Sequence, residues 1–359
     1  MIYTSGTTGR PKGVKRARAT TLGAALARMR AAGLAYGLDG RGPHLVTGPL
    51  YHAAPSLLAI YDLLNGATLL LMERWDAERC LELISTRRVR HTHLVPTMFV
   101  RLLKLPDEVR ARFDPSALAL VLHGATPISP EIKRRTIAWW GHVLVEYWGA
   151  TEGGVATLAT TAEWLARPGT VGRPIPAFEV YAADTEGRRL PPGEVGLLRS
   201  RHHTLAQVFE YHRNPAKTAA THPEPHVFTT GDLGYVDADG FVFLTDRTTH
   251  LIISGGVNIY PAEIEGVLVE HAAVADVAVF GVPDDEWGES VKAAVELAAG
   301  HSPSPALEAE LLDFVASRLA RYKVPRSIDF EAALPRLQNG KLYVRALRDR
   351  YWQGRARNI

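Results

Sequence analysis

Residues 118–147 read LALVLHGATPISPEIKRRTIAWWGHVLVEY, and they predict a strand, a helix and a second strand in succession. The apolar run at 118–122 has the length of a buried strand. The Ser-Pro pair at 129–130 provides a helix N-cap and a first-turn proline, so we expect a helix that continues to Trp140. A second apolar run follows at 143–147. Buried strands joined by a helix are typical of a parallel sheet covered by helices.

The same alternation of helix and strand precedes this stretch. Asn65-Gly66 stops the first helix, Asp76 is a suitable N-cap for the second, and Pro96 can open the third. The expected elements are a helix over 56–64, a strand over 67–72, a helix over 76–88, a strand over 91–95 and a helix from residue 96. The pattern therefore extends the predicted α/β region to residues 56–147.

The pattern changes after about residue 170, where glycine, proline and short alternating segments predict antiparallel strands. Asp237–Gly240 separates two alternating runs and indicates a hairpin. Beyond residues 246–249 we expect a compact α+β unit with helices over 261–271, 306–321 and 342–351 and strands over 274–279 and 291–297. The predicted domains are residues 1–246 and 247–359.

Composition narrows the function classes. The 359 residues are 46% hydrophobic, which suits about two globular domains. The 41 basic and 38 acidic residues leave a formal net charge of +3, too small to indicate nucleic acid or a membrane surface as a partner. Cys80 is the single cysteine, so no disulfide or thiolate metal site can form within the chain. No signal pattern or apolar run near the ~20 residues of a membrane span occurs, and we expect a cytoplasmic protein.

The strongest local signal of chemistry is Tyr3–Gly13, YTSGTTGRPKG. Glycine and small hydroxyl residues let backbone N–H groups approach phosphate oxygens closely, and Lys12 adds a positive charge. The spacing is not that of a Walker A loop, which places Gly-Lys-Ser/Thr after four intervening residues. A glycine turn without function is the alternative for the Gly/Thr/Ser run alone, and the added Pro-Lys-Gly favours phosphate binding.

Tyr3–Gly13 resembles the phosphate-binding loop of the adenylate-forming superfamily, which includes acyl-CoA synthetases, luciferases and peptide-synthetase adenylation domains. Further matches follow in the family's order along the whole chain. The resemblance implies the family's fold, with a large α/β domain, here partial, that also contains an antiparallel region, and a small mobile α+β domain at the C-terminus. It also implies ATP, Mg²⁺ and CoA as the nucleotide, the metal and the thiol substrate.

Three further segments carry the nucleotide part of the resemblance. HGATP at 123–127 resembles the loop whose backbone faces adenine, and YWGATEGG at 147–154 resembles the segment that stacks adenine, with tryptophan where the family usually has tyrosine. FTTGD at 228–232 resembles the ribose-binding motif, followed by an arginine near the ribose. The implied ATP- or AMP-binding residues are Thr4, Ser5, Gly6, Thr7, Thr8, Gly9, His123, Gly124, Ala125, Tyr147, Trp148, Gly149, Thr151, Asp232 and Arg247.

The resemblance also assigns catalytic residues. Glu152 would bind Mg²⁺ together with Thr8, and Lys12 and Lys341 would stabilise the reacting phosphate and carboxylate groups. PLYHAAP at 49–55 is similar to the segment beside the acyl channel, with His52 at its centre. Taken singly, His52 also fits a core or capping histidine, Glu152 a solvated carboxylate and Lys341 a solvated lysine.

The long match over 252–265 implies that Ser254, Gly255 and Gly256 line the path of the thiol after the small domain has rotated. At the hinge position the family usually has aspartate or lysine, and this chain has Thr249. The implied function is an acyl-CoA synthetase: ATP-dependent formation of an acyl adenylate, followed by a thioester with CoA. A fatty acid is the default substrate, and aromatic and steroid-type acids stay open.

Two alternatives to a CoA ligase stay open. One is adenylation alone or followed by transfer to a carrier-protein thiol, and the other is a catalytically incomplete remnant that binds ATP. The family has a large segment before its phosphate-binding loop, which starts here at residue 3. We therefore expect a truncated frame, a misplaced start or half of a split protein. Low solubility alone, a homodimer, or a second chain that supplies the missing segment is the expected consequence.

Overall fold

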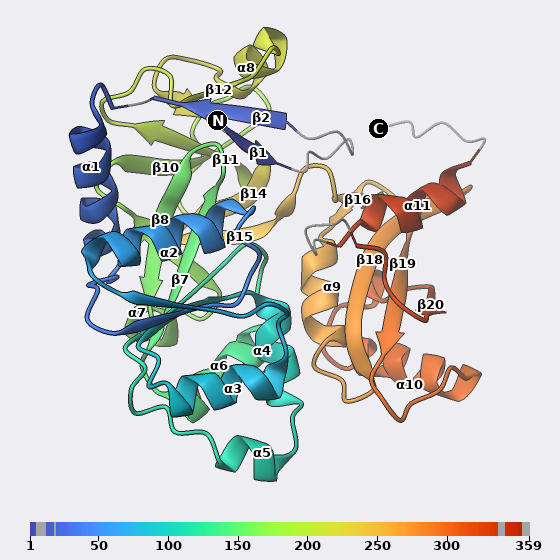
Figure 1. Ribbon diagram of the computed structural model, residues 1–359. Helices are drawn as coiled ribbons and strands as arrows, with labels where there is room; N and C mark the ends of the chain where they lie inside the picture. The colour runs from blue at the N-terminus through green and yellow to red at the C-terminus, as the bar shows by residue number, and fades with distance from the viewer. Residues whose placement is uncertain (5–11, 18, 337–341, 354–359) are drawn as a thin grey trace.

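The computed structural model describes residues 1–4, 12–17, 19–336 and 342–353, which form a large domain and a smaller C-terminal domain (Figure 1). In this part of the chain, the large domain contains a 12-stranded mixed sheet and a separate 3-stranded sheet, and the small domain contains a 5-stranded sheet. The predicted architecture, an α/β domain with an antiparallel region followed by a smaller α+β domain, is confirmed.

One half of the large sheet is parallel, as the alternation of strands and helices predicts. Its strands lie in the order β4-β3-β5-β6-β7. All four residues of β5 and of β6 are buried, which explains their continuous apolar character. The strands are β3 (Pro43–Val46), β4 (Thr68–Leu71), β5 (His91–Leu94), β6 (Leu120–His123) and β7 (Leu144–Ala150).

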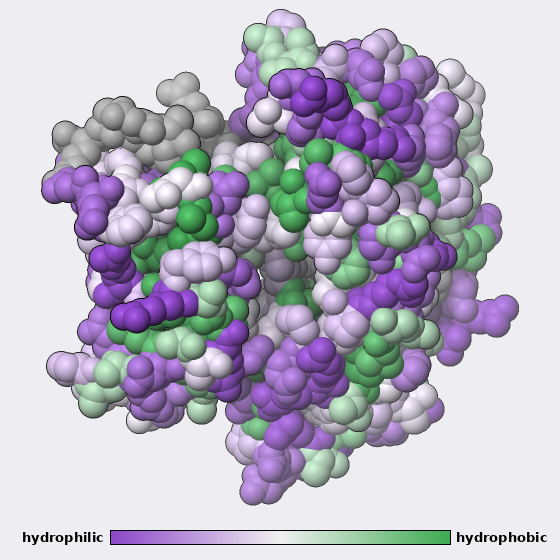
Figure 2. Space-filling model, turned by 180° about the vertical axis from the view of Figure 1, so that it is seen from behind, coloured by the Kyte–Doolittle hydropathy of each residue, from purple (hydrophilic) through white to green (hydrophobic). Residues whose placement is uncertain are grey.

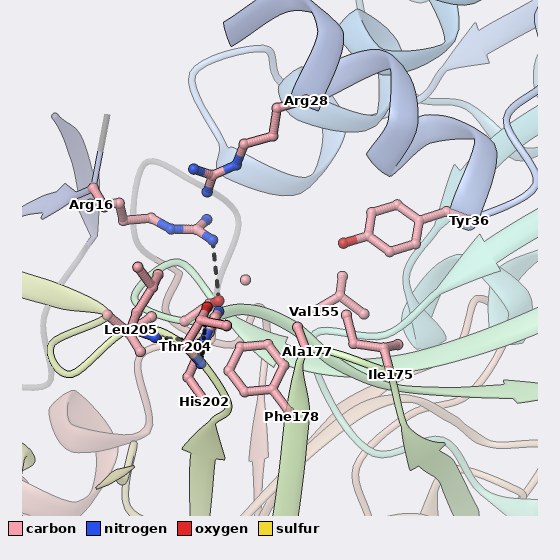
Figure 3. A pocket seen from close by; sticks show the side chains of 14 residues that line it. Arg16, Arg28, Tyr36, Val155, Ile175, Ala177, Phe178, His202, Thr204 and Leu205 are labelled. Atoms are coloured by element: carbon pink, nitrogen blue, oxygen red, sulfur yellow. Dashed lines mark hydrogen bonds between the residues drawn. The ribbon is translucent and has the colours of Figure 1, made fainter. Parts of the chain in front are cut away.

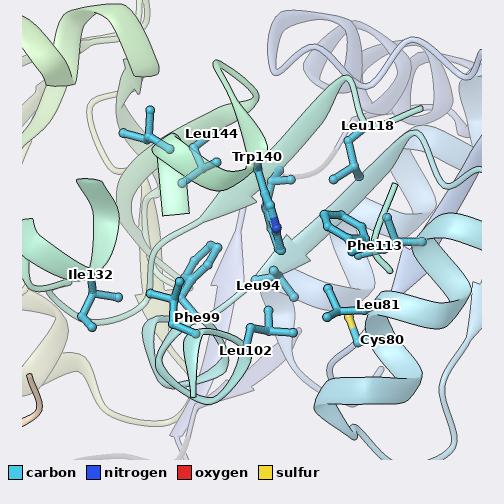
Figure 4. Close-up of a cluster of buried hydrophobic side chains, with 14 of the residues drawn as sticks. Cys80, Leu81, Leu94, Phe99, Leu102, Phe113, Leu118, Ile132, Trp140 and Leu144 are labelled. Carbon is cyan, nitrogen blue, oxygen red and sulfur yellow. The ribbon is translucent and has the colours of Figure 1, made fainter. Parts of the chain in front are cut away.

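Helices cover both faces of this parallel half. Val121 of β6 packs into the core beneath α3, α4 and α6, which Figure 4 shows around Phe99 and Trp140. The neighbouring residues Leu120 and Leu122 point to the opposite face and pack with Leu58 of α2. The helices are α1 (Leu22–Ala35), α2 (Ala53–Asn65), α3 (Ala77–Thr86), α4 (Pro96–Leu103), α5 (Asp107–Ala111) and α6 (Pro130–Trp140).

Of two predicted N-caps, one is confirmed and the other is not. Asp76 caps α3 as predicted, because its side chain accepts a hydrogen bond from the backbone N–H of Arg79. Ser129 precedes α6 but does not cap it, since its hydroxyl donates to Glu270 of the small domain at 2.5 Å. Helix α1 was not predicted, and it has an exposed surface that carries Leu22 and Leu34. No helix in the described ranges is long and apolar enough to cross a membrane.

The other half of the large sheet is antiparallel, as predicted beyond residue 170. The predicted hairpin at 237–240 joins β14 to β15. The side chain of Thr160 and that of Glu163 cap each other's backbone at the start of the short helix α7. The elements are β8 (Gly154–Thr160), α7 (Thr161–Ala166), β9 (Thr170–Pro174), β10 (Phe178–Ala183), β11 (Gly196–His202), β13 (Val227–Phe228), β14 (Asp232–Val236) and β15 (Val242–Arg247).

The 3-stranded sheet joins the start of the chain to a segment almost two hundred residues later. Strand β2 (Lys12–Arg16) pairs with β1 (Ile2–Thr4) on one side and β12 (Phe209–Tyr211) on the other. Helix α8 (Pro215–Thr221) follows β12. Backbone pairing therefore holds the strand that begins at Lys12 beside β12.

The small domain contains the predicted helices and strands with different bounds: α9 and α10 end earlier than predicted, and the two strands are longer. Helix α10 ends at Ala316, because the Ser317 hydroxyl caps the carbonyl of Phe314, and a 3₁₀ turn follows at Arg321–Lys323. The elements are β16 (Ile252–Ser254), β17 (Val257–Ile259), α9 (Pro261–Leu268), β18 (Val274–Asp284), β19 (Gly288–Leu297), α10 (Pro305–Ala316), β20 (Ser327–Glu331) and α11 (Val344–Trp352). Strand β20 lies parallel to β19.

The two domains meet around the end of β15, close to the domain boundary that we propose after Asp246. The Asp246 carboxylate accepts from the backbone N–H of Ala262 at 3.1 Å, and Lys104, directly after α4, donates to the carbonyl of Val274. Figure 2 shows the surface hollowed between the two domains. A pocket of about 410 Å³ lies between them, and its lining includes Ile128 of the large domain and Lys323 of the small one.

Candidate active site

The Asp232 carboxylate joins Trp148 and Arg247, which come from other strands, and the nearby Thr230. Its Oδ1 accepts from Arg247 Nε at 2.9 Å, and its Oδ2 accepts from Trp148 Nε1 at 3.3 Å and from Thr230 Oγ1 at 2.6 Å. The pairing of β14 with β15 places Asp232 directly opposite Arg247. Three of the predicted nucleotide-binding residues, Asp232, Arg247 and Trp148, therefore lie together.

Trp148 is mostly buried. Only 8% of its surface is exposed, and the residue packs in the core of the antiparallel region. Although tryptophan lacks the phenol hydroxyl of the family's usual tyrosine, its indole N–H supplies a hydrogen bond to Asp232. The position of the indole is thereby fixed by packing and by one polar contact.

Glu152 lies in the turn between β7 and β8, and its carboxylate has a specific partner. Its Oε1 accepts a hydrogen bond from the Tyr211 hydroxyl at 2.9 Å. Burial first, and then the negative charge of Glu152, raise the pKa of Tyr211, so that this phenol stays protonated and acts as a donor. Lys217 Nζ lies 5.0 Å from the centre of the Tyr211 ring.

Lys12 lies close to the same group of residues. Burial and the neighbouring Lys217 lower the pKa of Lys12 to about 8, and the charge of Glu152 partly opposes this shift. An ammonium group whose pKa is lowered by burial and by a neighbouring cation is stabilised by a bound anion. Arg247 acts on the pKa of Tyr211 as well, which indicates that the Asp232 and Glu152 groups are neighbours. We call Lys12, Trp148, Glu152, Asp232 and Arg247 the charged site.

The predicted adenine loop follows β6. A Cβ added to Gly124 would lie 2.5 Å from the carbonyl oxygen of Tyr147, so the close approach of these two strands needs glycine. Ala125 has φ 75°, an uncommon conformation for a residue with a side chain. The Tyr147 hydroxyl is 3.0 Å from His93 Nε2. The hydrogen bond to His93 thus holds the ring of Tyr147 against the loop at Gly124.

A buried charged pair fixes helix α6 to the sheet under this loop. Lys133 Nζ donates to Glu146 Oε2 at 2.5 Å, and both residues are almost fully buried. Burial lowers the pKa of Lys133 and raises that of Glu146, while their mutual attraction opposes both shifts. His123 Nε2 lies 4.0 Å from the same carboxylate, and burial holds the pKa of His123 well below its ordinary value. Its side chain faces inward, so only the His123 backbone can face a ligand.

The remaining predicted residues lie at several places. His52 precedes α2, with its ring 5.1 Å from that of Tyr51. Ser254 ends β16, and Gly255 and Gly256 form the turn to β17 with φ 57° and 79°. Thr4 ends β1, Gly149 lies in β7, and Thr151 lies in the turn beside Glu152. Ser5, Gly6, Thr7, Thr8, Gly9 and Lys341 lie outside the described residues, and their roles stay predictions.

Sequence reasoning missed Tyr211 and Lys217. Both belong to the segment 209–217, where neither residue spacing nor composition indicates a contact with Glu152. Only the pairing of β12 with β2 brings this segment to the site. The sequence Pro-Ala-Lys-Thr at 215–218 indicates at most the start of a helix.

Tyr211→Phe is expected to lower kcat/KM for Mg-ATP about fivefold, the size of one ordinary hydrogen bond. The substitution removes only the donor that orients the Glu152 carboxylate, so the concentration of Mg²⁺ needed for half-maximal rate should rise. Steady-state kinetics over a Mg²⁺ titration measures both effects. Tyr235→Phe is the matched control, because that ring stacks on Phe243 at 4.7 Å in the 12-stranded sheet, away from β12. Equal Mg²⁺ dependence in both variants would contradict the contact's role.

The residues present fit Mg²⁺ bound together with a nucleotide. In the described part of the chain no group of three or more His, Cys, Asp or Glu residues could hold a metal by itself. Magnesium in nucleotide sites typically takes one or two protein carboxylates, with water and phosphate oxygens completing its shell. Glu152, held by Tyr211 and close to Lys12, provides such a carboxylate.

Comparison with known proteins agrees with this geometry. Residues 1–209 match the AMP-binding enzyme family, and residues 263–341 match the AMP-binding enzyme C-terminal domain. The chain belongs to the AMP-binding, adenylate-forming family. Membership confirms the resemblance found in the sequence and places the chain among ligases that activate acids through an adenylate.

Individual relatives cover the whole of this chain. A fatty acid–[acyl-carrier-protein] ligase, ScoC of Streptomyces coeruleorubidus, is 36% identical over 100% of this chain and 68% of its own length. The medium/long-chain-fatty-acid–CoA ligase FadD8 of Mycobacterium tuberculosis is 33% identical over 100% of this chain and 62% of its own. The chain thus spans roughly two thirds of the length of these family members.

A solved structure extends the match to three dimensions. O-succinylbenzoate coenzyme A synthetase (MenE) of Bacillus subtilis, in complex with ATP and a magnesium ion, has a TM-score of 0.80 and 29% identity. The superposition covers 98% of this chain and 69% of that one. Family members of this fold therefore use ATP with Mg²⁺.

Proposed function

We propose that this chain activates a carboxylic acid with ATP and transfers the acyl group to the thiol of CoA. In the first step a carboxylate oxygen attacks the α-phosphorus of ATP. A bond forms between that oxygen and phosphorus, the bond to the β-phosphate oxygen breaks, and pyrophosphate leaves. In the second step the thiol sulfur attacks the acyl carbon, AMP leaves, and the thiol proton passes to solvent.

The observation that supports this proposal most strongly is the charged site itself. Arg247 and Trp148 fix the orientation of the Asp232 carboxylate, which the binding of ribose hydroxyls requires. Glu152, Tyr211 and Lys12 lie beside this carboxylate. Both reactants of the first step are anionic, so positioning and charge neutralisation carry the catalysis. Bound Mg²⁺ would supply charge neutralisation on the phosphates.

Each residue of the charged site would then have its own role. Lys12 would bind phosphate oxygens, Glu152 would hold Mg²⁺, and Asp232 would fix the ribose hydroxyls. Lys341 would reach the reacting carboxylate, and Ser254–Gly256 would line the thiol path after rotation of the small domain. Separate conformations for the two steps fit a small domain joined through a short turn after Arg247.

A carrier-protein thiol is the second candidate acceptor. The relative ScoC is named as a fatty acid–[acyl-carrier-protein] ligase, and its identity of 36% exceeds the 33% of the CoA ligase FadD8. Both relatives are named as ligases of fatty acids. The first half-reaction is the same for either acceptor.

Product analysis by mass spectrometry tests the proposed function. The purified chain is incubated with Mg-ATP, CoA and a panel of fatty, aromatic and steroid-type acids. Acyl-CoA and AMP are the expected products, and Lys341→Ala should abolish both. Lys15→Ala is the matched control, since Lys15 only pairs with the exposed Glu210 at 2.9 Å. Folded protein that yields no AMP with any acid would contradict activity of this chain alone, and AMP without acyl-CoA would favour the carrier-protein acceptor.

A further inference from the structure

A pocket of about 360 Å³ lies beside the charged site, between helix α1 and the strands of the antiparallel region (Figure 3). Its floor is apolar, with Val155, Ile175, Phe178 and Leu205 in the lining. An apolar floor suits the body of a carboxylic acid substrate.

The opposite wall of this pocket is positively charged. Figure 3 shows the guanidinium groups of Arg16 and Arg28 and the hydroxyl of Tyr36 directed toward the same space. Arg16 makes one hydrogen bond to a backbone carbonyl, that of Gly153 at 3.1 Å. Within the described residues, no carboxylate lies within 4.0 Å of either guanidinium. Two arginines close together without an acidic partner form a site for an anion.

His202 does not add to the positive charge of the pocket. His202 lines the floor, and its Nδ1 accepts hydrogen bonds from the backbone N–H groups of Thr204 and Leu205 at 3.1 Å. Burial, and then the charges of His203 and Arg28, lower the pKa of His202, so its ring stays neutral at neutral pH. The positive charge of the pocket therefore comes from the two arginines.

The pocket is connected to the charged site through two segments. Gly153 and Gly154 line the pocket and directly follow Glu152. Strand β2 begins at Lys12 and ends at Arg16, four residues along an extended strand, which corresponds to about 13 Å. An extended acid that reacts in the charged site can therefore reach Arg16 with its far end.

We propose that this pocket binds the far end of the acid substrate and that the substrate carries a second anionic group there. The favoured substrate is a dicarboxylic acid, with an apolar chain over Val155 and Phe178 and its distal carboxylate between Arg16 and Arg28. This inference rests on the proposed function and narrows its acid from a simple fatty acid to an acid with two anionic ends. The phosphates of CoA are the other source of the same anionic chemistry.

The test compares acids of equal length in pyrophosphate release without CoA: octanoate with suberate, and decanoate with sebacate. The wild type should have the lower KM for the dicarboxylates. Arg28→Gln should raise the KM for sebacate about tenfold, because a charge-assisted hydrogen bond is lost, and should leave the KM for decanoate unchanged. Arg30→Gln is the matched control, since Arg30 is an exposed residue of the same helix outside the pocket.

Three results overturn the assignment: a lower KM for the monocarboxylates in the wild type, an equal effect of Arg28→Gln on both acids, or an effect of Arg28→Gln only on the KM for CoA in the complete reaction. The last result would assign the pocket to the phosphates of CoA. Calorimetric titration with sebacate separates this inference from the proposed function. If no acid is turned over, the proposed function fails, and binding of sebacate by the wild type but not by Arg28→Gln still supports the anion pocket.

Discussion

Replacing Glu152 with glutamine is expected to slow adenylate formation by about 10²–10³-fold, the usual cost of removing one group that stabilises transition-state charge. Glutamine keeps the shape of the side chain, and its amide oxygen can still accept from Tyr211, which lies 2.9 Å from Glu152 Oε1. The substitution therefore removes the negative charge and little else. Because that charge is the proposed link to Mg²⁺, the required Mg²⁺ concentration should rise as well.

Acid-dependent pyrophosphate release at several Mg²⁺ concentrations measures this effect. Glu210→Gln is the matched control, since Glu210 is the neighbour of Tyr211 on β12 and pairs with Lys15 on the exposed side. The control should keep nearly the wild-type rate. A Glu152→Gln variant with the same rate and Mg²⁺ dependence as the control would exclude Glu152 as the metal-binding carboxylate.

Lys133→Met is expected to lower the free energy of unfolding by roughly 3–5 kcal/mol. Lys133 is fully buried, its Nζ is 2.5 Å from Glu146 Oε2, and it lies 4.8 Å from the centre of the Trp164 ring. Removing the lysine leaves the Glu146 carboxylate buried without its cation, which costs far more than losing a methylene contact. Since the pair fastens α6 beneath the Gly124 loop, nucleotide affinity should fall with stability.

Urea denaturation of the single and double variants measures this cost. The double variant Lys133→Met with Glu146→Leu should recover most of the stability, because a buried ion pair and a well-packed apolar pair are often similar in energy. Arg134→Met, one residue along α6, removes an exposed pair with Glu131 at 3.8 Å and a guanidinium 5.9 Å from the centre of the Trp164 ring, and should change stability by about 1 kcal/mol or less. A Lys133→Met variant as stable as Arg134→Met would show that the pair does not hold the helix.

The parallel half of the fold could be predicted because its signals are local. β6, α6 and β7 each bury a continuous or periodic apolar face, and Asp76 caps α3 through its own neighbours. Helix α1 was missed because its apolar residues are spread around the helix and several of them are exposed. Ser129 was predicted to cap α6 and instead contacts Glu270, a tertiary contact that a local pattern cannot reveal.

In the candidate site, too, some residues could be predicted from the sequence and others could not. Motif order alone identified Trp148, Asp232 and Arg247, which the structure joins by hydrogen bonds. Tyr211 could not be predicted, because its contact with Glu152 depends on the pairing of β12 with β2 across almost two hundred residues. The arginines of the anion pocket were missed for the same reason: Arg16 and Arg28 meet only through the packing of α1 over the sheet.

The central claim is that this chain forms an acyl adenylate, and acid-dependent exchange of labelled pyrophosphate into ATP tests it most directly. The exchange needs no thiol, so it isolates the first half-reaction from the choice of acceptor. We predict exchange that requires both Mg²⁺ and a carboxylic acid, proceeds without CoA and is lost in Glu152→Gln but not in Glu210→Gln. Protein that is folded by circular dichroism and shows no exchange with any mono- or dicarboxylic acid would contradict the claim.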